Sequence, residues 1–116
     1  MRTAKSRTSS NNTLAELFGT IRSEIANLPG VRPGKRSFRI GQKIFVRFAE
    51  QPDRVFLEFK LPSEEAGRPT HHAFVRPMEF GGMGRHGWVE VSITRKSQLP
   101  VVRRLISLSH ALYRQT

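Results

Sequence analysis

The sequence predicts an α+β domain in which an antiparallel sheet of about four to five strands is covered on one face by N- and C-terminal helices. Three observations support this prediction. Apolar residues recur at helical spacing near both ends of the chain, alternating apolar and polar residues mark strands between them, and glycine and proline separate these segments. Strands flanked by helices are typical of α+β folds with a largely antiparallel sheet. The second face of the sheet is then expected to be at least partly open to solvent or to a partner.

The first helix is expected from Thr13 to about Asn27. Asn12 or Thr13 can cap its start, and Glu16 lies three residues after Thr13, as in a capping box. Pro29-Gly30 ends it. We expect residues 1–12, which are rich in Arg and Ser and lack acids, to form a flexible basic arm, and residues 13–116 to form a single domain.

The middle of the chain alternates as strands do, with turn residues at the breaks. The expected strands are Ser37–Ile40, Lys43–Ala49, Arg54–Leu61, a short Ala73–Pro77, and Trp88–Thr94. Gly41-Gln42 joins the first two as a hairpin. A last helix is expected from about Ser97, a plausible cap, to Arg114.

The apolar positions of these elements predict the core. They are Leu17, Ile21, Ile25, Val55, Leu57, Phe59, Val89, Val91, Leu105 and Leu112. We also expect Phe38, Phe45 and Phe48 to be buried, and Trp88 to anchor the core, although an exposed ring could instead stack on a base.

Positive charge is the strongest compositional feature of this chain of 116 residues. Lys and Arg number 20 against nine acidic residues, a net charge of +11. Without residues 1–12, which contribute Arg2, Lys5 and Arg7, 17 basic and nine acidic residues remain, a net +8. The excess therefore belongs to the predicted domain, and a field of this sign attracts phosphate polyanions.

Several classes of site are not expected. The chain has no cysteine, which excludes disulfides, thiolate catalysis and zinc sites that use sulfur. Adjacent His71 and His72 point opposite ways in an extended chain, so they cannot easily bind one metal ion together. Ser107 and His110 are three residues apart on the last helix, but they lack the orienting acid of a catalytic triad. No run of 18 apolar residues occurs. We therefore expect a cytoplasmic protein that is not an enzyme and has no cofactor, metal or membrane partner, as a monomer or weak dimer.

The candidate binding site is a basic hairpin. No acid occurs between Glu24 and Glu50, and that interval holds six basic residues. The expected nucleic-acid contacts are Arg36, Arg39, Lys43 and Arg47, with Arg85 of the glycine-rich GGMGRHG segment as an outlying contact.

The length of the hairpin turn decides the geometry of this site. A three-residue turn would place Arg39 opposite Lys43, on the face that carries Arg47. A two-residue turn would pair Ile40 with Lys43 and divide the basic residues between the faces. The alternative to a binding site is a solvated edge hairpin whose charges oppose aggregation.

Four segments resemble the MmcQ/YjbR family of small bacterial proteins. They are LPGV (Leu28–Val31), GQKIF (Gly41–Phe45), VFLEFKLP (Val55–Pro62) and PMEFGGMGRHGWVEVSI (Pro77–Ile93). The most specific part is Gly84-Arg85-His86-Gly87-Trp88-Val89, similar to the family's G-[KR]-[HS]-G-W-V turn and strand. The resemblance implies a fold similar to that of the bacterial frataxin CyaY. The family has been described as having a DNA-binding, "double wing" fold, so the resemblance also implies DNA binding.

The chain also departs from that family. The region where the family often has a helix is reduced to SEEAG, and Ser109-His110-Ala111 stands where the family often has Ser-Tyr-Arg. Iron binding of the frataxin type is not implied, because the first helix offers only Glu16 and Glu24. The sequence thus favours a nucleic-acid-binding protein, DNA being the expected partner. The alternative is a protein-interaction or small-ligand adaptor that uses the open sheet face.

Overall fold

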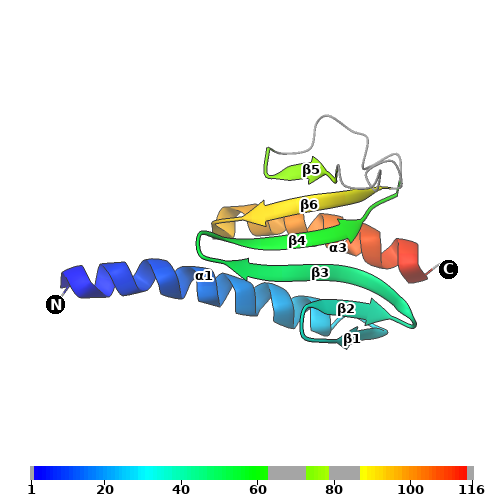
Figure 1. The fold of residues 1–116 in the computed structure, drawn as a ribbon, viewed down its shortest axis with the longest axis horizontal. Helices are drawn as coiled ribbons and strands as arrows, with labels where there is room; N and C mark the ends of the chain where they lie inside the picture. Colours follow the sequence, from blue (N-terminus) through cyan, green and yellow to red (C-terminus); the bar gives the residue numbers. More distant parts are fainter. Residues whose placement is uncertain (1, 63–72, 79–86, 115–116) are drawn as a thin grey trace.

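The sheet has six antiparallel strands in the order β1-β2-β3-β4-β6-β5 (Figure 1). The fold comes from a computed structural model that describes residues 2–62, 73–78 and 87–114, with side chains from residue 14 onward except at Glu50. The strands are β1 (Val31–Pro33), β2 (Ser37–Ile40), β3 (Lys43–Gln51), β4 (Arg54–Lys60), β5 (Val75–Pro77) and β6 (Trp88–Ile93). The predicted α+β class is confirmed, with one strand, β1, beyond those expected.

Two long helices cover the same face of this sheet (Figure 1). They are α1 (Arg2–Ala26) and α3 (Leu99–Arg114), the latter preceded by a 3-10 turn, η2 (Lys96–Gln98). The predicted end of the first helix is confirmed to within one residue, but the predicted start near Thr13 is wrong. Once a helix has nucleated, each further residue adds a hydrogen bond at little cost, so α1 continues back through the segment that we expected to be a flexible arm.

The start of α3 also differs from the prediction. Ser97 lies in η2 and is not the cap of the helix. The side chain of Gln98 reaches back across η2, where its Oε1 accepts the backbone N–H groups of Thr94 and Arg95, at 2.8 and 3.2 Å. Pro100 lies in the first turn of α3, where its missing N–H removes no helical hydrogen bond.

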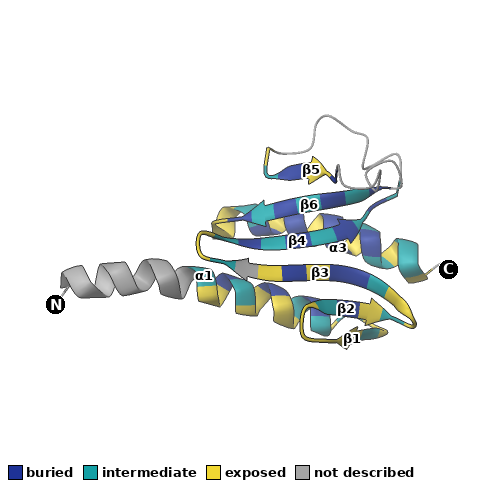
Figure 2. Ribbon diagram, in the orientation of Figure 1, coloured by how far each residue is buried: buried dark blue, intermediate teal, exposed yellow. Residues whose placement is uncertain are grey.

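The core lies between the helices and the sheet (Figure 2). Nine of the ten predicted core residues are buried, and so are the three phenylalanines Phe38, Phe45 and Phe48. Leu112 is only half-buried, and its prediction is wrong. In the last turns of α3, His110 and Tyr113 instead make the ring contacts with Phe45.

The sheet face turned away from the helices, here called the outer face, is more exposed. Along β4, the residues Val55, Leu57 and Phe59 are buried, whereas the alternating residues Arg54 to Lys60 are half-buried. Strand β6 has the same pattern. The expectation that one face is at least partly open is confirmed for the strands.

Candidate nucleic-acid interface

The turn of the basic hairpin has two residues. Gly41 and Gln42 connect β2 to β3, and Ile40 pairs with Lys43. Gly41 has a φ of +61°, which L side chains rarely adopt. A positive φ at only the first turn position is typical of a type II′ hairpin turn. Of the two alternatives, the two-residue turn is therefore the one found, and the basic residues are divided between the faces.

A β-bulge in β3 determines which basic residue of the hairpin lies on the opposite face from the others. The register shifts by one residue beyond Arg39, so Phe45 is extra in β3. Phe45 and Val46 are both fully buried on the helix side. Without the bulge, Arg47 would share a face with Lys43, four residues earlier. The bulge moves Arg47 to the outer face, together with Arg39, and Lys43 remains on the other side.

Four of the five predicted contacts are exposed, and the fifth, Arg85, lies outside the described residues. Arg39 and Arg47 share the outer face. Arg36 lies in the loop between β1 and β2, and its carbonyl accepts the N–H of Phe48 at 3.0 Å, which holds it beside Arg47. The structure therefore brings three of the predicted residues together.

The sequence prediction missed Arg32. This exposed residue of β1 pairs directly with Arg39 of β2, so both lie on the same face. Because β1 has only three residues, ends in Pro33 and shows no apolar alternation, its sequence indicates a turn rather than a strand. The signal that could have found it is the repeated Val-Arg-Pro, which also forms the opposite edge strand β5.

Together these cations line one edge of the sheet, which we call the basic edge; its strand arginines lie on the outer face and Lys43 on the helix side. Its exposed members are Arg32, Lys35, Arg36, Arg39, Lys43 and Arg47. Within the described part of the chain, none of them has an ion pair within 4.0 Å. Arg39 Nη1 donates to the backbone oxygen of Gln42 at 3.2 Å, which fixes its guanidinium without neutralising it.

The outer face changes character beyond Arg47. Across the sheet, Arg47 is followed by Glu58, Glu90 and Arg76, each paired with the next. Burial raises the pKa of Glu58; Arg47 opposes this, and Glu90 adds to it. Arg76 lies 3.9 Å from Glu90. The middle of the face is thus of mixed charge, in contrast to the basic edge, whose cations have no ion pair within 4.0 Å among the described residues.

Aromatic residues do not support base stacking at the basic edge. Phe38 and Phe48 stack against each other in the core, with ring centroids 5.0 Å apart. Trp88 is not the core anchor that we expected, because it alternates with buried Val89 and faces outward, half-buried, opposite Lys60. The outer face therefore carries an aromatic side chain, but away from the basic edge.

Three further polar residues of α3, Ser107, Ser109 and His110, lie outside the basic edge. His110 Nε2 lies 2.8 Å from the carbonyl oxygen of Pro29, a contact between α3 and the end of α1. Ser109 is buried and Ser107 is exposed, so the two point different ways. No group of three or more His, Asp or Glu residues there could hold a metal ion. Among the described helices, none is long and apolar enough to cross a membrane.

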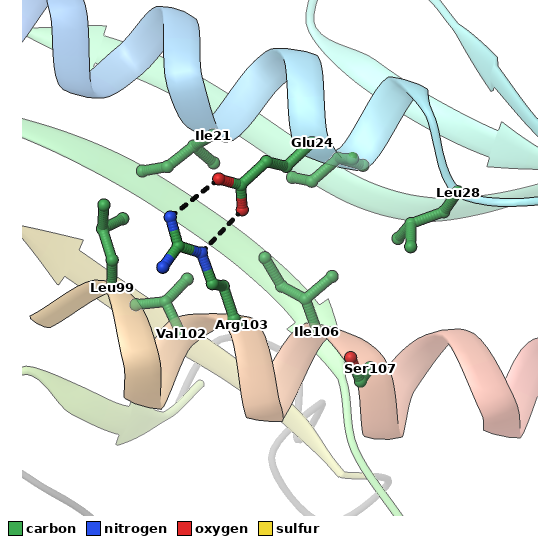
Figure 3. Close-up of a pocket in the computed structure, with 9 residues that line it drawn as sticks. Ile21, Glu24, Leu28, Leu99, Val102, Arg103, Ile106 and Ser107 are labelled. Carbon is green, nitrogen blue, oxygen red and sulfur yellow. Dashed lines mark hydrogen bonds and ion pairs between the residues drawn. The ribbon is translucent and has the colours of Figure 1, made fainter.

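A groove of about 250 Å³ lies between α1 and α3 (Figure 3). Its walls are apolar, and a bidentate ion pair crosses it, with Arg103 Nε and Nη2 donating to the Glu24 carboxylate at 2.9 and 2.8 Å. The groove is on the helix side of the molecule, away from the basic edge.

Comparison with known proteins yields neither a matching family model nor a matching curated protein, so the resemblance to the MmcQ/YjbR family stays a prediction.

Proposed function

We propose that this domain is a non-enzymatic nucleic-acid-binding protein that contacts the phosphate backbone through the basic edge, with DNA as the expected partner in the cytoplasm. The observation that carries the proposal is the gathering of exposed cations from three adjacent strands, Arg32, Arg39 and Arg47 among them, with no ion pair within 4.0 Å in the described part of the chain. Arginine suits this role because its planar fork matches phosphate oxygens.

The same geometry favours binding without sequence preference. Backbone phosphates carry charge but no sequence information. The hairpin phenylalanines are buried and offer no ring to a base. Affinity should therefore come from released counterions and fall steeply with salt. The family resemblance, with its DNA-binding description, agrees with this proposal.

The test is titration of labelled duplex and single-stranded DNA at several salt concentrations. The triple variant Arg39→Gln, Lys43→Gln, Arg47→Gln removes three charges from the basic edge. It should bind every sequence more weakly, and its salt dependence should be shallower by about two to three units of slope.

A matched control removes three exposed charges elsewhere. Arg95→Gln, Lys96→Gln, Arg114→Gln changes the net charge equally, at the two ends of the C-terminal helical segment. If the two triple variants weaken DNA binding alike, the basic edge is not the site, and binding reflects net charge alone.

The outer face supports a second candidate, a protein-interaction or small-ligand adaptor. Phe56 and Trp88 are half-buried there, and the Arg54 guanidinium lies 5.9 Å from the centre of the Phe56 ring. Half-exposed aromatic side chains are common in binding surfaces. Recovery of one stoichiometric protein partner that Trp88→Ala releases, with no salt-dependent DNA binding, would favour this candidate.

A further inference from the structure

The edge of the sheet brings two arginines into direct opposition. Arg32 of β1 and Arg39 of β2 are partners in the antiparallel ladder. Opposed residues in such a ladder have side chains close together, and like charges at these positions destabilise the pair. Neither arginine has an acidic partner within the described residues. The fold therefore carries an unrelieved repulsion that a bound anion would relieve.

These two arginines also line a hollow. Its volume is about 360 Å³, within the range of small-ligand sites. The other lining residues are Pro33, which ends β1, and Gly34, Gly41 and Gln42 from the segments that follow β1 and β2. The lining contains no acid and no large apolar side chain, which favours an oxyanion over an apolar ligand.

The guanidinium of Arg39 is already oriented. Its Nη1 donates to the backbone oxygen of Gln42 at 3.2 Å. Its Nε–Nη2 edge has no hydrogen-bond partner among the described residues. The same edge of Arg103 grips the Glu24 carboxylate with two hydrogen bonds of 2.9 and 2.8 Å. Arg39 therefore presents a free bidentate donor pair that suits a phosphate oxygen pair.

We propose that Arg32 and Arg39 form a two-arginine oxyanion site, which holds one phosphate group in the hollow between the β1 and β2 turns. The inference deepens the proposed function and rests on it for the source of the phosphate, which is the nucleic-acid backbone. In this arrangement the bound phosphate fixes the register of the strand on the basic edge, and the other cations contribute long-range attraction.

The test uses the full chain and two probes. Sodium phosphate is titrated against sodium chloride at equal ionic strength, and the arginine Nε–Hε resonances and the melting temperature are followed. Phosphate should shift the Arg32 and Arg39 resonances saturably and raise the melting temperature, because a ligand that binds only the folded state stabilises it. Chloride should do neither.

The decisive double variant keeps both positive charges and removes the two planar guanidinium groups. Arg32→Lys, Arg39→Lys should lose the stabilisation by phosphate and bind duplex DNA about tenfold more weakly, the equivalent of roughly 1.4 kcal/mol. The matched control, Arg95→Lys, Arg114→Lys, should retain both properties. Circular dichroism of both variants checks that the fold is intact.

The outcomes separate this inference from the proposed function. If the wild type binds DNA but shows no saturable phosphate shifts, and the lysine variant binds DNA equally, the oxyanion site is refuted and the proposed function stands. If phosphate binds at Arg32 and Arg39 but DNA does not bind, the site stands with a free phosphate compound as its ligand, and the proposed function fails. Absence of both effects overturns both.

Discussion

Gly41 and Gly87 both have a positive φ, yet their surroundings differ. A Cβ added at Gly41, in the hairpin turn, would have no atom within 4 Å, whereas a Cβ added at Gly87 would overlap the carbonyl oxygen of Leu61. Leu61 donates its N–H to the Gly87 carbonyl at 2.7 Å, so the two backbones must lie close together. Glycine at position 87 is therefore required both by the positive φ and by the close approach of the Leu61 backbone, whereas glycine at position 41 is required only by the positive φ.

Substitution by alanine should separate these two requirements. Gly41→Ala should lower the free energy of unfolding by about 1 kcal/mol, the cost of a left-handed conformation. Gly87→Ala should cost at least about 2 kcal/mol, because overlap is added to strain. Urea denaturation measures both, and equal losses would contradict the close approach at Gly87.

Glu58 should make stability depend on pH. Its pKa is raised above the ordinary 4.5, so the folded state holds this proton more tightly than the unfolded state does. The stabilisation by protonation is present below pH 4.5 and is lost as the pH rises through the raised folded-state value. Glu58→Gln removes this titration, so its free energy of unfolding should vary less than that of the wild type between about pH 4 and pH 7. Identical pH profiles in urea denaturation would refute the assignment.

Leu57 tests the assignment of the two sheet faces. It is 1% exposed, between the helices and the sheet, whereas its neighbour Phe56 is half-buried on the outer face. Leu57→Ala should lower the free energy of unfolding by about 2–5 kcal/mol. Phe56→Ala should cost less, although it removes more atoms. The reverse order in thermal or urea unfolding would contradict the face assignment.

At the scale of single residues, the sequence predicted the candidate site only in part. Exposure of Arg36, Arg39, Lys43 and Arg47 followed from their charge, but the face of each depended on the turn and the bulge. Three consecutive apolar residues, Ile44-Phe45-Val46, break the strict alternation and could have indicated the bulge. The cross-strand pairing of Arg32 with Arg39 depends on strand β1, which the local sequence pattern does not predict.

The two edge strands use the same device against aggregation. Both β1 and β5 have three residues and end in proline. Gly34 donates its N–H to Ser37 and Met78 donates to Trp88, so the preceding prolines have their nitrogens turned away from the paired strand. A further strand would need a donor at these positions, and proline offers none.

Pro33→Val should therefore restore a donor at the outer side of β1. The variant should associate with itself as concentration rises, and size-exclusion chromatography with light scattering would detect it. Pro52→Ala, in the turn between β3 and β4, is the control for loss of a proline that lies at no edge. A Pro33→Val protein that elutes as the wild type does at every concentration would show that proline does not protect this edge.

The reliability of the element predictions follows from length and burial. Strands β4 and β6 pair with neighbours on both sides and bury alternate residues completely, so their alternation is clear in the sequence. The edge strands bury at most one residue each, and β1 none. The predicted helix starts are wrong for different reasons: α1 continues back past Thr13, and Ser97, the expected cap of α3, lies instead within the 3-10 turn η2.

The positive charge of the molecule gathers in more than one place. The helices cover one face, and the basic edge lies along β1, β2 and the start of β3 (Figure 1). Further basic residues, Arg2, Lys5 and Arg7, belong to the first turns of α1. A general field attracts any polyanion, whereas a site requires several cations on one surface. The two sources of affinity can be separated because each can lose three charges independently.

Neutralising either the three basic residues at the start of α1 or three of the basic edge, in the full chain, separates general electrostatic attraction from binding at a defined site. Arg2→Gln, Lys5→Gln, Arg7→Gln and the basic-edge triple variant Arg39→Gln, Lys43→Gln, Arg47→Gln both reduce the net charge from +11 to +8. If the basic edge binds phosphates, its variant should lose clearly more DNA affinity at low salt, and only its salt dependence should flatten by about two to three units. If instead the helix variant loses all affinity and the basic-edge variant loses none, DNA is held by the start of α1 and the hairpin charges only solubilise the sheet edge. Fluorescence anisotropy at matched ionic strength, with circular dichroism to verify folding, distinguishes these results.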